Sequence, residues 1–103
     1  MRVAICSDLH LEFGDIILKN TDNAEVLILS GDILIAQDLR NARAEIFLDF
    51  IQRCSTEFPH VVVIAGNHEF YHGKWKDSIQ TLRHGYSKFP NVYFLEQDMK
   101  VIN

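Results

Sequence analysis

Side chains that commonly bind metal ions follow three apolar segments of the sequence. Asp8 and His10 come after the first segment, Asp32 after the second and Asn67 after the third. These residues offer carboxylate oxygen, imidazole nitrogen and amide oxygen without a thiolate, a donor set that suits Mn, Fe or Zn. A carboxylate such as Asp32 can bridge two ions about 4 Å apart, and metal pairs at that spacing serve phosphoester hydrolysis. The three groups together therefore predict a metal site, although each alone could be a turn.

The apolar segments before these residues are predicted to be β-strands. They cover residues 2–6, 25–29 and 61–65, and a fourth covers residues 92–95. Each is a continuous apolar run rather than an alternating one, which is typical of strands covered on both faces. Three successive strands thus deliver polar residues at their carboxyl ends.

Two helices are predicted between the strands. Apolar residues recur at spacings of three and four over residues 39–58, with Asp38 as the N-cap and Pro59 just past the end. Residues 75–89 repeat this spacing up to Pro90. Strands that alternate with helices indicate an α/β fold with parallel pairing and right-handed crossovers. In such folds the ligand site lies at the carboxyl ends of the strands, where the polar residues are.

Composition narrows the class of protein. A chain of 103 residues, 48% of them hydrophobic, has room for one domain. The net charge of −4 means that bulk positive charge does not hold a phosphate group, so if the protein acts on phosphate, a bound metal ion is expected to supply the positive charge. No segment approaches the about 20 apolar residues of a membrane span, and Asp8 interrupts any signal peptide, so a cytoplasmic protein is expected.

Cys6 and Cys54 match no metal or redox motif and are expected to be buried thiols.

The polar groups also resemble the motifs of a known family. Asp8-Leu9-His10, Gly31-Asp32 and Gly66-Asn67-His68-Glu69, in this order and each after an apolar strand, resemble the first three motifs of the calcineurin-like metallophosphoesterases. The resemblance covers nearly the whole chain. It implies a parallel β-α-β-α-β layer that corresponds to about half of the family's α-β-β-α sandwich.

The resemblance also implies a role for each motif residue. Asp8 and His10 would bind the first metal ion, Asp32 would bridge both ions, and Asn67 would bind the second. His68 would contact the phosphate and protonate the leaving group, which makes it the catalytic candidate. The implied activity is hydrolysis of a phosphomonoester or phosphodiester by a hydroxide activated at a binuclear metal centre.

Later motifs of the family are not found in this sequence. Family members supply a further His and a Gly-His-x-His motif beyond this point, so residues 1–103 are expected to be a single truncated domain with an incomplete site. The complete family site holds two divalent ions, and one weakly held ion is expected here. The alternative function is a non-catalytic truncated α/β module or partner subunit with a residual metal site.

The same resemblance indicates which partners to expect. A phosphoester is the expected substrate, nucleic acid is expected only as a possible substrate, and no membrane contact is expected. A half sandwich leaves one face of the sheet uncovered, so self-association or binding to a complementary chain is also expected.

A competing motif overlaps the third group. His68, Glu69 and His72 satisfy the H-E-x-x-H pattern, in which two histidines on a helix bind zinc and the Glu is the general base. The β-branched strand and the Gly-Asn pair before it, and Gly73 after it, disfavour the required helix. A zinc protease is therefore not expected. The family resemblance implies that Glu69, the last acid of the third motif, is a structural residue or one that supports the ligands rather than a ligand itself. His72 is expected to be a surface residue, with replacement of a missing ligand as the alternative.

Overall fold

The computed structural model describes residues 1–11, 16–33, 39, 44–66, 69, 75–96 and 102. Within this part of the chain four parallel strands form one sheet in the order β1-β2-β3-β4, and two helices join the later strands. The elements are β1 (Val3–Cys6), β2 (Val26–Ser30), α1 (Ala44–Glu57), β3 (His60–Ile64), α2 (Trp75–Tyr86) and β4 (Val92–Phe94). The predicted α/β fold with a parallel layer is confirmed.

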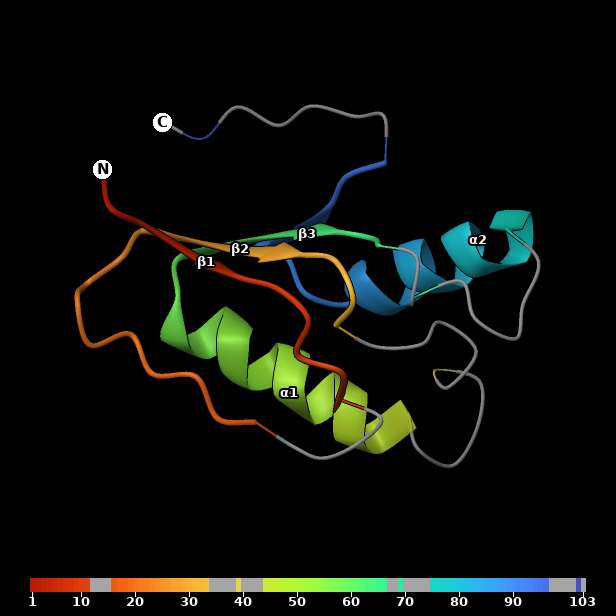
Figure 1. The fold of residues 1–103 in the computed structure, drawn as a ribbon, viewed down its shortest axis with the longest axis horizontal. Coiled ribbons are helices and arrows are strands. Elements are labelled where there is room, and N and C mark those ends of the chain that lie inside the picture. The colour runs from red at the N-terminus through yellow and green to blue at the C-terminus, as the bar shows by residue number, and fades with distance from the viewer. Residues whose placement is uncertain are drawn as a thin grey trace.

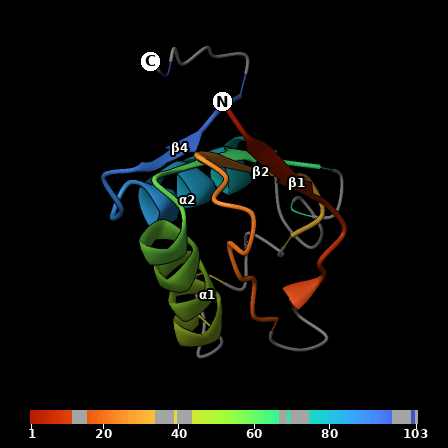
Figure 2. The ribbon, with the colours of Figure 1, turned by 90° about the vertical axis from the view of Figure 1, so that its left-hand side faces the viewer.

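Both helices lie on the same side of the sheet, as Figures 1 and 2 show. The strand order explains this arrangement. Each strand is added at the same edge, and right-handed crossovers that all advance in one direction place every connecting helix on one face. The opposite face receives neither helix, which differs from the two-sided cover that the apolar runs indicated.

The hydrophobic core fills the space between the sheet and the helices. Leu27 and Leu29 of β2 and Val61 and Val63 of β3 are almost fully buried. They pack in one cluster with residues of both helices, among them Phe47, Phe50, Ile51, Cys54, Leu82 and Tyr86. In the described part of the chain, neither helix has the length and apolar character needed to cross a bilayer.

The other face of the sheet carries exposed apolar side chains. Ile5 is 68% exposed, Val3 47% and Ile64 40%. The strand register aligns Ile5 with half-buried residues of the other three strands, Ile28, Val62 and Tyr93. This apolar row is the uncovered face expected from the sequence.

The helix boundaries differ from the predicted ones. Helix α1 begins at Ala44, and the predicted cap Asp38 lies outside the described residues. Helix α2 ends at Tyr86 rather than at residue 89, because the Phe89 N–H turns back to the Tyr86 carbonyl at 3.2 Å just before Pro90. The chain thereby leaves the helix early enough to enter β4 at Val92.

An asparagine closes the carboxyl end of α1. The Asn91 side-chain amide donates to the carbonyls of Ser55 at 2.8 Å, Phe58 at 3.1 Å and Pro59 at 3.1 Å. The last carbonyls of a helix have no partner within the helix, and the bond to Ser55 satisfies one of them, whereas Phe58 and Pro59 lie just beyond the end of α1. They also attach the start of β4 to the end of α1.

Candidate metal centre

Two loops at the carboxyl edge of the sheet run side by side. The first ligand loop, residues 7–11, follows β1, and the second ligand loop, residues 31–33, follows β2. Backbone pairing continues between them beyond the strands: Asp8 N–H donates to the Gly31 carbonyl at 3.0 Å, and His10 N–H to the Asp32 carbonyl at 3.1 Å. A third bond joins Leu11 N–H to the Ile33 carbonyl at 2.8 Å. This pairing brings three of the predicted metal ligands to one place.

The three predicted ligands share an unusual backbone conformation. Asp8, His10 and Asp32 have φ angles of 57°, 49° and 55°, in the left-handed region. Among the described non-glycine residues only Asn23 joins them there. L-residues in this region carry strain that surrounding structure must offset, and such residues gather at functional sites. The strain concentrated on these three supports their role as ligands.

The side chains of the first ligand loop face one another. His10 Nε2 lies 3.9 Å from Asp8 Oδ1, with the His10 side chain 32% and the Asp8 side chain 63% exposed. The Ser7 hydroxyl donates to Asp8 Oδ2 at 2.8 Å. This bond is the main reason that the pKa of Asp8 is lowered, and a side-chain hydrogen bond with Asp32 and the nearby His10 act in the same direction. Asp8 is therefore ionised at neutral pH, as a ligand must be.

The contact between Asp8 and Asp32 suits a cation. The Asp8 side chain makes a hydrogen bond with that of Asp32, and a positive ion would relieve the repulsion between two neighbouring carboxylates. Their oxygens and the His10 imidazole are the donor types that Mn, Fe and Zn accept. In the described part of the chain no three His, Cys, Asp or Glu side chains already converge as a metal site. The donors therefore fit a divalent ion in type, and the set that the described residues supply is incomplete.

Glu69 occupies a buried position beneath the second ligand loop. Its side chain is 1% exposed. Oε1 accepts hydrogen bonds from the N–H groups of Asp32 and Gly66, both at 2.8 Å, and Oε2 accepts one from Ile33 at 2.7 Å. A carboxylate engaged in this way does not face solvent as the general base of a zinc protease must. The expected structural role of Glu69 is confirmed.

Two glycines allow the loops after β2 and β3 to touch. A Cβ on Gly31 would lie 3.1 Å from the Gly66 Cα, and Gly31 has a φ of 90°. A Cβ on Gly66 would lie 2.7 Å from Asp32 Oδ1 and 3.0 Å from the Asp32 nitrogen. The sequence placed both glycines in turns and in the family motifs but did not indicate that they touch, and it gave Ser7 no role. Their contacts join separate loops, and local patterns carry no signal for such contacts.

The remaining predicted residues lie outside the described part of the chain. These are Asn67, the predicted second-metal ligand, His68, the catalytic candidate, and His72. The sequence places Asn67 and His68 between Gly66 and Glu69, both of which the structure describes. Their assignment stays a prediction.

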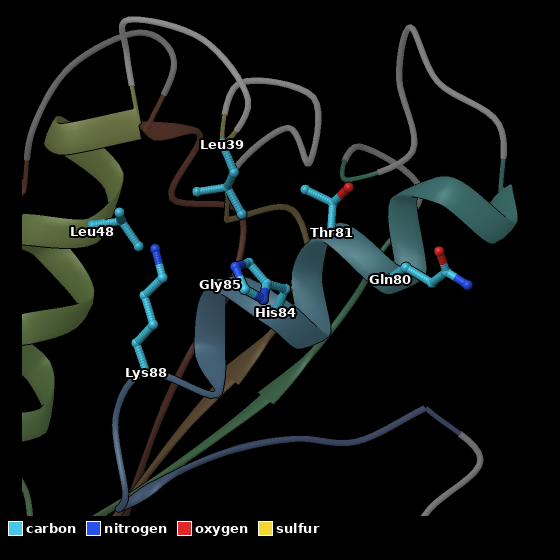
Figure 3. A pocket seen from close by; sticks show the side chains of 7 residues that line it. All are labelled: Leu39, Leu48, Gln80, Thr81, His84, Gly85 and Lys88. Carbon is cyan, nitrogen blue, oxygen red and sulfur yellow. The ribbon is translucent and has the colours of Figure 1, made fainter.

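A separate pocket of about 240 Å³ lies on the helical side of the molecule. Figure 3 shows Leu48 of α1 on one side and Thr81, His84 and Gly85 of α2 on the other. None of the residues that line it comes from the ligand loops. The pocket is therefore not part of the candidate metal centre.

Comparison with known proteins identifies one family. The family model of the calcineurin-like phosphoesterases matches residues 1–100. The match includes all four strands and both ligand loops. No curated protein and no solved structure gives a significant match.

Proposed function

This chain belongs to the calcineurin-like phosphoesterase family, and we propose that its ligand loops form the metal centre of a phosphomonoesterase or phosphodiesterase. One observation carries the proposal. Asp8, His10 and Asp32 lie on paired loops at the carboxyl edge of the sheet, and all three have left-handed backbones. Single Asp or Asn residues take this conformation in ordinary turns, but three potential ligands that share it on two paired loops are typical of a functional site.

The proposed roles follow the motifs. Asp8 and His10 bind the first ion, Asp32 binds both ions and Asn67 binds the second. His68 gives a proton to the leaving oxygen of the phosphoester. The 3.9 Å distance between His10 Nε2 and Asp8 Oδ1 supports the first of these roles, because it brings an imidazole nitrogen and a carboxylate oxygen to the same place.

The charge of the chain supports dependence on metal. With 14 acidic and 10 basic residues, the chain is net negative and repels a phosphoester at long range. Divalent ions, when bound, neutralise phosphoryl oxygens and lower the pKa of water. The chain's own residues would then hold these ions and orient the substrate beside them.

The two ion sites are proposed to differ in affinity. Asp8, His10 and Asp32 give the first site three donors, whereas Asp32 and Asn67 give the second only two. Isothermal titration calorimetry with Mn²⁺ should therefore show one dominant site of modest affinity. Two tight sites would contradict this ligand assignment and require further donors from His72 or from another chain.

Hydrolysis of bis-p-nitrophenyl phosphate with Mn²⁺ tests the activity directly. Turnover should be lost in Asp32→Ala and retained in His84→Ala, because His84 is exposed on α2 outside the ligand loops. The same variants assayed with p-nitrophenyl phosphate distinguish a monoesterase from a diesterase. Absence of Mn²⁺-dependent turnover by the wild-type chain would refute the enzyme and leave the alternative, a non-catalytic module with a residual metal site.

A further inference from the structure

We propose that Glu69 is a positioning residue that holds Asp32 in its ligand conformation and sets the distance between the loops after β2 and β3. This inference rests on the proposed function, since it assigns Asp32 to the metal centre. The Glu69 carboxylate is 1% exposed and accepts three backbone hydrogen bonds of 2.7–2.8 Å. Two of the donors belong to the second ligand loop and one to the chain after β3.

The bonds account for how Asp32 keeps a left-handed backbone. Its N–H donates to Glu69 Oε1 at 2.8 Å, and its carbonyl accepts from His10 N–H at 3.1 Å. Both peptide groups of Asp32 are therefore fixed, which sets the direction in which its side chain leaves the backbone. Hydrogen bonds to an ionised carboxylate are roughly twice as strong as neutral ones, so Glu69 can offset the strain at a φ of 55°.

The same carboxylate fixes the neighbouring loop. Oε1 is shared between Asp32 N–H and Gly66 N–H, so one atom ties the two loops together. The glycines at this point permit backbone contact, with Gly66 Cα only 3.1 Å from where a Gly31 Cβ would lie. The chain that leaves Gly66 continues directly into Asn67 and His68. Glu69 thereby couples the two segments that carry the proposed second-metal ligands.

Glu69 is not a ligand in this arrangement. Both of its oxygens are occupied by backbone donors, and its side chain is withdrawn from solvent. Substitution to Gln keeps the length but replaces one acceptor with an NH₂ group, which repels the N–H that it would face. Residues that orient metal ligands in this indirect way typically cost about 10–100-fold in metal affinity when they are replaced.

The test compares Glu69→Gln with Glu25→Gln, the same chemical change at an exposed acid just before β2. Mn²⁺ affinity is measured by titration calorimetry, and hydrogen exchange of the Asp32, Ile33 and Gly66 amides by NMR. We expect Glu69→Gln to bind Mn²⁺ about 10–100-fold more weakly and to lose protection at these amides, with Glu25→Gln unchanged. Wild-type affinity and protection in Glu69→Gln would overturn the inference.

Two further measurements separate this inference from the proposed function. If Asp32→Asn weakens Mn²⁺ binding and Glu69→Gln does not, the positioning role of Glu69 is overturned. The proposed metal centre is then still supported. A wild-type chain that binds no Mn²⁺ overturns the proposed function, and the amide exchange alone then decides for or against the bonds to Glu69. If Glu69→Gln does not fold, amide hydrogen exchange in the wild-type protein tests the inference instead. The amides of Asp32, Ile33 and Gly66 lie outside the strands, and fast exchange there would overturn the inference.

Discussion

Substitution of Gly66 by Ala probes the contact between the loops that follow β2 and β3. The added Cβ would lie 2.7 Å from Asp32 Oδ1, 3.2 Å from its Cγ and 3.0 Å from its backbone nitrogen. The carboxylate can rotate away, but the backbone nitrogen cannot, because Glu69 holds it at 2.8 Å. The substitution must therefore either separate the loops or turn the Asp32 side chain from its position.

Two opposing effects set the change in the free energy of unfolding that Gly66→Ala causes. Overpacking of this kind costs about 1–3 kcal/mol. A Gly-to-Ala change also restricts the unfolded chain and returns about 0.4–1 kcal/mol where the backbone suits Ala. The steric term dominates, so we expect the free energy of unfolding to fall by about 1–2 kcal/mol. In a chain of this size Tm should drop by roughly 4–8 °C for each kcal/mol.

Chemical unfolding in urea, with and without Mn²⁺, measures both consequences. Gly85→Ala is the matched control, because among the described residues its Cβ would meet only the flexible end of Leu39 at 3.1 Å and a helical Ala is favoured over Gly. We expect Gly85→Ala to be neutral or stabilising, and Gly66→Ala to be less stable and weaker in Mn²⁺ binding. A Gly66→Ala protein with the wild-type unfolding midpoint and Mn²⁺ affinity would refute the close approach of the loops.

Three further predictions concern the core and the open face of the sheet. Tyr86→Phe should raise the free energy of unfolding by about 1 kcal/mol in urea titrations, because within the described structure the buried Tyr86 hydroxyl has no hydrogen-bond partner; a loss of stability would contradict this. Burial raises the pKa of the Cys54 thiol to about 12, so the folded state keeps it protonated while the unfolded chain ionises near pH 9. The contribution of this thiol to the free energy of unfolding should then be fully present below about pH 9 and be lost as the pH rises toward 12. Unfolding midpoints that stay constant over this interval would show that the thiol is not buried. Ile5→Lys on the exposed apolar row should shift the protein toward monomer in light scattering, because Ile5 is 68% exposed, whereas a wild-type protein that is already monomeric would exclude self-association through this face.

The sequence alone predicts the order of the strands and helices and the edge of the sheet at which the candidate metal ligands lie. Strand and helix periodicities are local, so Val61 to Ile64 could be assigned without knowledge of the fold. Parallel pairing then follows from alternation, and parallel strands end at a common edge. This reasoning predicts that Asp8, His10 and Asp32 lie at the same edge of the sheet.

Tertiary structure alone decided how those ligands are held. Sequence spacing gives no sign that Asp8 and His10 adopt left-handed backbones, because that conformation is imposed by pairing with the second ligand loop more than 20 residues away. It also gives no sign that Glu69 bonds to Asp32 and Ile33, which precede it by 37 and 36 residues.

The faces of the sheet illustrate the same division. Continuous apolar runs such as residues 26–29 indicated cover on both sides, yet the strand order placed both helices on one. The hydrophobicity of a strand shows only that its residues are apolar. The direction in which successive crossovers advance decides which face of the sheet the helices cover. That direction depends on how strands far apart in the chain pair, and Ile5 is left exposed as a result.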